Sequence, residues 1–238
     1  QVRVLQSDAA LSPVEGRYKI FIIREIERAT APAANALLKT LEEPPAHVIL
    51  ILTSRRRDLV LPTVLSRCQV LNLRPAALEQ VQAALETRWG VEPTQAELLA
   101  RLSGGRVGWA VTAHLQPAVT QERRRRLEEL LALTATGYVG RLSYAEKLSR
   151  QPDAIEETLG LWAAWWRDVL LIQRGAPDVI INLDYRAQLV QQASLYPPAQ
   201  VEAALHNLVQ TLHRIRANVN MRLALDVLTL RLPKPGVI

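Results

Sequence analysis

Two short apolar runs near the start of the chain have the pattern of buried strands. Lys19–Ile23 and Val48–Leu52 are rich in β-branched side chains, which favours buried parallel strands. A third strand is predicted over residues 69–73. Between the first two, a helix is expected from a cap at Thr30 to the break at Pro44. Strands that alternate with helices predict a parallel sheet with right-handed crossovers.

After Pro75 the strand pattern stops and helical periodicity takes over. The predicted short helices span residues 78–89, 95–102 and 107–115. Longer amphipathic helices are expected from about residue 121 onward. In one of them, Trp162, Trp165 and Trp166 share an apolar stripe, which favours a core or subunit-interface position over base stacking. The chain is therefore predicted to be mainly α, with a partial α/β domain at its start.

Composition narrows the classes of site. Cys68 is the only cysteine, which excludes an intrachain disulfide and a four-cysteine zinc site, and the four histidines lack metal-ligand spacing. We therefore expect no metal and no cofactor. The longest apolar run, Val48–Leu52, is too short for a bilayer, and no signal pattern opens the chain, so no membrane partner and a cytoplasmic location are expected. Because the chain opens on Gln1 within a predicted helix, we expect a fragment.

Three ordered motifs resemble a known family. NALLKTLEEPP at residues 35–45, ILTS at 51–54 and LPTVLSRC at 61–68 are similar to the clamp-loader branch of the AAA+ ATPases. NVNMRLALDVL at 218–228 resembles the collar-domain ending of bacterial delta-prime and gamma/tau subunits. The resemblance implies three parts. These are a partial AAA+ (RecA-like) domain with a parallel sheet over 1–75, a small helical lid over 76–120 and a helical collar, the oligomerisation domain, over 121–238.

The family's ATPase chemistry is incomplete here. No phosphate-binding GxxxxGK[ST] loop occurs in the 238 residues. After the first strand, where motor subunits have an acidic pair that helps to hold Mg²⁺, this chain has Arg24 and Glu25. The resemblance therefore implies the delta-prime type of subunit, which has no ATPase activity of its own. Glu25 is then expected to pair with Arg24 or Arg28.

The residue expected to act in catalysis is Arg67, which lies in the motif Ser66–Arg67–Cys68. In the family this arginine is a finger presented in trans to the ATP of a neighbouring subunit, where a planar, always-charged guanidinium stabilises the transferring phosphoryl group. Without the motif, an ion pair with Glu42 or Glu43 would be the better interpretation. Cys68 opens an apolar segment, so buried packing is favoured over a nucleophilic role.

The remaining polar positions have weaker assignments. Thr53 and Arg106 resemble the first and second sensor positions, and both are expected to be structural without a local ATP. The run Arg55, Arg56 and Arg57 is either a phosphate or partner contact or a solvated turn. Arg123 to Arg126, followed by Glu128 and Glu129, is expected to form helical ion pairs on a solvated face.

The resemblance also implies partners. They are gamma/tau and delta subunits in a hetero-pentamer that loads the sliding clamp onto primed DNA. Two alternatives remain, namely an active gamma/tau-type ATPase whose phosphate loop has been truncated, and a freestanding helical DNA-binding protein. The net charge of +6 makes a polyanion partner plausible. However, residues 76–238 hold 18 basic against 16 acidic residues, so their near balance argues against the DNA-binding alternative.

Overall fold

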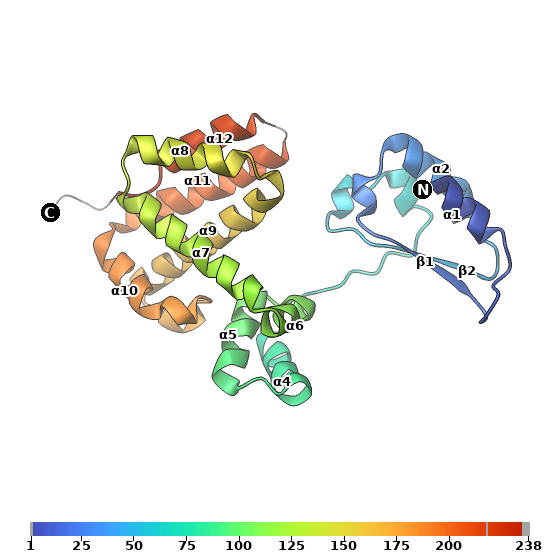
Figure 1. Cartoon of the computed structure of the whole chain (residues 1–238), viewed down its shortest axis with the longest axis horizontal. Coiled ribbons are helices and arrows are strands. Elements are labelled where there is room, and N and C mark those ends of the chain that lie inside the picture. Colours follow the sequence, from blue (N-terminus) through green and yellow to red (C-terminus); the bar gives the residue numbers. More distant parts are fainter. Residues whose placement is uncertain (1, 218, 235–238) are drawn as a thin grey trace. The chain divides into compact units, whose positions relative to one another are not determined.

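The computed structural model describes residues 2–217 and 219–234, and it divides the chain into two compact units, 1–74 and 75–238 (Figure 1). Gln1 and Asn218, which the sequence analysis used, lie outside the described residues. The fold is mainly α with a small parallel sheet, as predicted. No helix in the described ranges is long and apolar enough to cross a membrane.

The first unit contains the sheet. Its strands are β1 (Lys19–Ile23) and β2 (Val48–Leu52), its helices are α1 (Val2–Ala9), α2 (Ala31–Glu42) and α3 (Pro62–Leu65), and its 3-10 turns are η1 (Ile26–Arg28) and η2 (Arg57–Leu59). The strands pair in parallel, with Lys19 opposite Val48 at the start of the register. The predicted parallel pairing is confirmed. In Figure 1 the two arrows lie side by side.

Helix α2 follows its predicted bounds for the expected reasons. The Thr30 hydroxyl accepts a hydrogen bond from the Ala33 N–H at 3.4 Å and caps the first turn. Pro32 lies in that turn, where no intrahelical donor is needed. Ala34 and Leu37 are buried against the strands' inner face.

The sheet differs from its prediction in two ways. Both strands were expected to be fully buried, but Ile20, Ile22, Ile49 and Ile51 on one face are 40–64% exposed. The core cluster of this unit packs only against the other face. The prediction of a third strand over residues 69–73 is wrong. Those residues are extended and have no strand partner in the described part of the chain, and a strand needs a neighbour to pair its backbone groups.

The second unit begins with three short helices. They are α4 (Leu78–Trp89), α5 (Pro93–Ser103) and α6 (Val107–Leu115), close to the predicted bounds. The break between α5 and α6 needs glycine at Gly105, whose φ is +81°. A Cβ there would come within 2.5 Å of the Ala76 backbone oxygen, so any side chain would clash.

Longer helices form the rest of this unit. They are α7 (Pro117–Ala135), α8 (Tyr138–Ser149), α9 (Pro152–Gln173), α10 (Arg186–Leu195), α11 (Pro198–Arg216) and α12 (Met221–Leu230), with 3-10 turns η3 (Pro177–Val179) and η4 (Leu183–Tyr185) between α9 and α10. The side chains of Trp162, Trp165 and Trp166 are fully buried in the core, which confirms their predicted packing and excludes base stacking. Helix α7 runs through residues 120 and 121, and the predicted division there stays a prediction.

A buried arginine fixes the end of this bundle. Arg141 in α8 has no exposed surface and donates hydrogen bonds of 2.7–3.1 Å to backbone oxygens only. The acceptors are the carbonyls of Thr134, Thr136, Thr229, Leu232 and Pro233. Burial lowers the pKa of Arg141. The final helix α12 is capped at its start, because Asn220 Oδ1 accepts from the Leu223 N–H at 3.0 Å.

Candidate functional site

Arg67 follows the last turn of α3, where the chain leaves the helix. Pro62 starts this helix, and the backbone N–H of Arg67 still bonds the Val64 oxygen at 3.1 Å. Val64 anchors the turn because it is buried in the core cluster of the first unit. The Arg67 side chain is 31% exposed, so its guanidinium lies at the surface on a rigid support.

The guanidinium of Arg67 is held within the chain. Its Nε donates to Glu42 Oε1 at 2.6 Å, and its Nη2 forms an ion pair with the same oxygen. Its Nη1 donates to the Thr63 backbone oxygen at 2.9 Å and to Ser66 Oγ at 3.2 Å. The ion pair with Glu42 that the sequence offered as an alternative is therefore present in the structure.

The neighbours of Arg67 in its motif support its position. Ser66 Oγ donates to the Thr63 backbone oxygen at 3.1 Å, which orients the hydroxyl that Arg67 contacts. Cys68 is partly buried against the core, and burial raises the pKa of its thiol. A raised thiol pKa disfavours the thiolate, so Cys68 packs as predicted and is a poor nucleophile.

Glu25 lies at the tip of β1 in a left-handed conformation with φ of 53°, which no other non-glycine residue in the described ranges shares. Its backbone N–H donates to Thr53 Oγ1 at 3.3 Å. Its two carboxylate oxygens pair separately with Arg28 Nη1 at 2.9 Å and with Arg55 Nη2 at 3.3 Å. The expected pair with Arg28 is confirmed, and Arg55 is a second partner that the sequence analysis missed.

Arg24 precedes this cluster and is exposed. Across the described residues, no hydrogen bond or ion pair of its side chain is present. Glu25 is already neutralised by two arginines, so the strand tip carries more positive than negative charge. Such a tip does not suit a divalent cation. In the described ranges, no group of three or more His, Cys, Asp or Glu side chains is arranged to hold a metal ion.

Thr53 and Arg106 are positioned by local structure. Thr53 donates its backbone N–H to the Ile23 oxygen at 2.9 Å and accepts from the Ile26 N–H at 3.0 Å, which joins the two strand tips. Arg106 Nε donates to the Ser103 backbone oxygen at 2.7 Å, and its guanidinium lies 5.9 Å from the centre of the Trp109 ring. Both contacts hold the fold and agree with the structural roles expected of the two residues.

Two of the three arginines in the loop after β2 are paired within the chain. Arg55 contacts Glu25, as described, and Arg56 forms two hydrogen bonds of 2.6 and 2.9 Å with Asp58. The hydrogen bond from Arg56 lowers the pKa of Asp58. These pairs are typical of an ordered turn at the surface.

The arginine run of α7 divides into two roles. Arg125 forms helical ion pairs with Glu122 at 2.6 Å and Glu129 at 2.7 Å, as predicted for a solvated face. The same prediction is wrong for Arg123, whose side chain is only 9% exposed. Arg123 donates to Asp184 at 2.6 Å, and its position on the inner side of α7 explains the difference.

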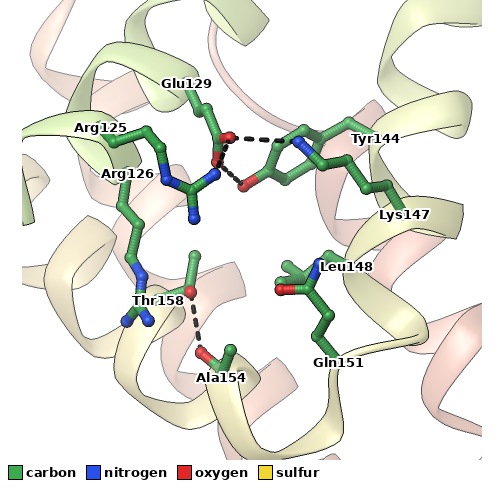
Figure 2. Close-up of a pocket in the computed structure, with 9 residues that line it drawn as sticks. All are labelled: Arg125, Arg126, Glu129, Tyr144, Lys147, Leu148, Gln151, Ala154 and Thr158. Carbon is green, nitrogen blue, oxygen red and sulfur yellow. Dashed lines mark hydrogen bonds and ion pairs between the residues drawn. The ribbon is translucent and has the colours of Figure 1, made fainter. Parts of the chain in front are cut away.

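A small hollow lies between α7, α8 and α9, and Figure 2 shows its charged wall. Glu129 accepts from Arg125 at 2.7 Å, from the Tyr144 hydroxyl at 2.8 Å and from Lys147 at 3.3 Å. Burial, together with the hydrogen bond to Glu129, raises the pKa of Tyr144. Because Arg125, Tyr144 and Lys147 all contact Glu129, these four residues form a structural network.

A second network was missed from the sequence. Asp168 is fully buried in α9 and accepts from the backbone N–H groups of Ile181 and Asn182, both at 2.9 Å. It also accepts from the Asn182 side chain at 2.7 Å. Arg101 in α5 donates to the backbone oxygen of Asp178 in the same loop. In the sequence, the one indication of this network was the carboxylate of Asp168, which lies close to the tryptophan stripe.

Two family models match the chain. Residues 1–77 match a family described as DNA polymerase III, delta subunit, and residues 117–233 match the family of its C-terminal region.

Among curated relatives, the chain is 28% identical to the DNA polymerase III subunit delta' of Bacillus subtilis, over 98% of this chain and 71% of that protein. It is 36% identical to the DNA polymerase III subunit tau of Salmonella typhimurium, over 43% of this chain and only 17% of that protein. Among solved structures, a gamma-subunit-related protein of Thermotoga maritima aligns with 96% of this chain and 76% of its own, with 20% identity and a TM-score of 0.42.

Proposed function

Because this chain belongs to the clamp-loader subunits of bacterial DNA polymerase III and is related to their delta' subunits, we propose that it assists ATP hydrolysis by a neighbouring subunit and hydrolyses none itself. This proposal has two parts. One concerns the strand tip of the chain, and the other concerns Arg67.

The strand tip supports the lack of ATPase activity. A hydrolysing site of this class needs a carboxylate that helps to hold Mg²⁺ beside the phosphates. Arg24 stands at that position, and a guanidinium repels the ion. Both carboxylate oxygens of Glu25 are engaged by arginines, Arg28 and Arg55, so a water molecule would have to compete with these ion pairs.

Arg67 supports the role in trans, and the observation that carries it is the SRC motif at an exposed helix end. The Arg67 side chain is 31% exposed and follows a helix whose Val64 is anchored in the core. An arginine finger needs this combination of a surface position and a rigid base, because its fork must meet the phosphoryl oxygens in a fixed geometry. Such fingers are worth on the order of 10³-fold or more in rate.

The proposed partners follow from the same relationship. We propose that the chain assembles with gamma/tau and delta subunits into a hetero-pentamer in the cytoplasm, which opens the sliding clamp and loads it onto primed DNA. In the region expected to form the collar, Val139 in α8 is 84% exposed and Leu223 in α12 is 59% exposed. Exposed apolar side chains on neighbouring helices are suited to contact another subunit.

Reconstituted complexes test the proposal. Steady-state ATP turnover, stimulated by DNA and clamp, is compared for complexes that contain the wild-type chain or Arg67→Ala at equal occupancy. We expect turnover and clamp loading to fall while assembly survives, and we expect Arg67→Lys to rescue poorly because an ammonium lacks the bidentate fork. Arg17→Ala, at an exposed arginine of the same unit, is the matched control. Equal turnover with wild type and Arg67→Ala would remove the finger role.

A further inference from the structure

We propose that Glu42 is a positioning residue for Arg67, one that holds the guanidinium against α3 until the triphosphate of a neighbouring subunit displaces it. The proposal rests on the proposed function of Arg67. It begins from the way in which the three guanidinium nitrogens are engaged.

Each nitrogen of the Arg67 guanidinium is engaged. The edge formed by Nε and Nη2 faces Glu42 Oε1, and Nη1 bonds the Thr63 oxygen and Ser66 Oγ. A finger stabilises a phosphoryl group best when it presents two parallel N–H groups from one edge. The Nε–Nη2 edge is not free while the Glu42 contact is intact, so a phosphate that binds bidentately through this edge must displace Glu42.

Glu42 has no evident purpose in its own helix. It is the last residue of α2, where the negative end of the helix dipole disfavours a carboxylate. Its ion pair with Arg67, 25 residues further along the chain, offsets that cost. Pro44 and Pro45 follow after Glu43 and restrict the backbone just beyond the end of the helix.

The free energy of the ion pair between Arg67 and Glu42 is small enough for a nucleotide to displace Glu42. The two side chains are 31% and 48% exposed, and ion pairs exposed to this degree contribute little free energy. An incoming triphosphate carries several negative charges, so it attracts Arg67 more strongly than a single carboxylate does and repels Glu42. The exchange therefore makes the approach of nucleotide and the release of the finger mutually dependent.

The test combines two substitutions in reconstituted complexes of the full chain. Glu42→Gln keeps the shape of the side chain and removes its charge. We expect ATP turnover in the absence of DNA and clamp to rise by about two- to fivefold, which is the factor that corresponds to the free energy of an exposed ion pair. Fully stimulated turnover should be unchanged. Glu43→Gln, at the adjacent exposed carboxylate, is the matched control and should have no effect.

The same substitution in an Arg67→Ala background separates the possible failures. If Glu42 acts through Arg67, Glu42→Gln will change nothing there. If Glu42→Gln changes turnover equally with and without Arg67, the positioning role is wrong. The role is also wrong if Arg67→Ala lowers turnover but Glu42→Gln leaves basal turnover unchanged. If Arg67→Ala has no effect on turnover at all, the proposed function fails, and the positioning role fails with it. Circular dichroism of each variant checks that the fold is intact.

Discussion

The guanidinium of Arg101 donates a hydrogen bond of 2.8 Å to the backbone oxygen of Asp178, which lies 77 residues further along the chain. A second bond of 3.1 Å reaches the Ile180 oxygen. Arg101 belongs to α5 in the short-helix region, and the acceptors belong to the loop after α9. The same loop is held from its other side by the buried carboxylate of Asp168. One side chain thus ties the short helices to the larger bundle.

Arg101→Ala should loosen this loop. We expect faster amide hydrogen exchange across residues 177–183 and a loss of about 1–2 kcal/mol in the free energy of unfolding, because two backbone acceptors lose a charged donor. Mass-spectrometric hydrogen exchange on the full chain is the measurement. Arg88→Ala, at an exposed arginine of α4, should leave the exchange of that loop unchanged. Identical exchange in wild type and Arg101→Ala would mean that the contact contributes no restraint.

Arg141 should be indispensable to the stability of the bundle. Its guanidinium is the shared donor for five backbone carbonyls, and Arg141→Met would remove this donor from all five. We expect a loss of about 3 kcal/mol or more in urea denaturation. Arg141→Lys should recover little, since an ammonium has three donors. Arg124→Ala, at an exposed position of α7, is the control. A loss below about 1 kcal/mol for Arg141→Met would contradict this account.

The chain by itself should not bind ATP with magnesium at micromolar affinity. The reasons are that no phosphate-binding GxxxxGK[ST] loop occurs in the 238 residues and that Arg24 stands where a carboxylate would help to hold Mg²⁺. Isothermal titration calorimetry is the direct measurement. Heats that fit a micromolar dissociation constant would instead favour the alternative of an active gamma/tau-type ATPase.

Assembly should depend on Val139 and Leu223, which are exposed apolar residues of α8 and α12. These two helices lie side by side in Figure 1. Val139→Asp and Leu223→Asp each place a charge where we expect a subunit contact, and a desolvated charge without a partner weakens an interface strongly. Co-elution with a gamma/tau subunit in gel filtration should be reduced. Val209→Asp in α11, which is 54% exposed in the isolated chain, tests whether any exposed apolar residue of the bundle has this effect. Unchanged co-elution for both α8 and α12 variants would remove this face from the interface.

Local sequence was sufficient for most helix ends and both strands. Thr30 and Asn220 cap their helices with side-chain oxygens, and this chemistry acts within three residues. The third strand failed because strand formation depends on a partner elsewhere in the chain, which the apolar pattern of residues 69–73 does not reveal.

The same distinction applies to the candidate site. The pairing of Arg125 was predictable because its partners are three and four residues away. Arg123 has no acidic residue three or four positions away, so the sequence could show that it lacks a helical ion pair. Its actual partner, Asp184, is 61 residues distant and is revealed only by the tertiary structure. For Arg67, the sequence supplied two alternatives, a finger and a pair with Glu42. The structure shows the ion pair between Arg67 and Glu42, and from it we infer that Glu42 positions Arg67.

The tryptophan core has a practical consequence for spectroscopy. All five tryptophans, including the three fully buried in α9, lie within residues 75–238, whereas residues 1–74 contain none. Intrinsic tryptophan emission therefore reports on the unit of residues 75–238 alone. Denaturation can be followed by tryptophan emission and then by far-ultraviolet circular dichroism, to which both units contribute. A comparison of the two curves will show whether the sheet-containing unit unfolds separately.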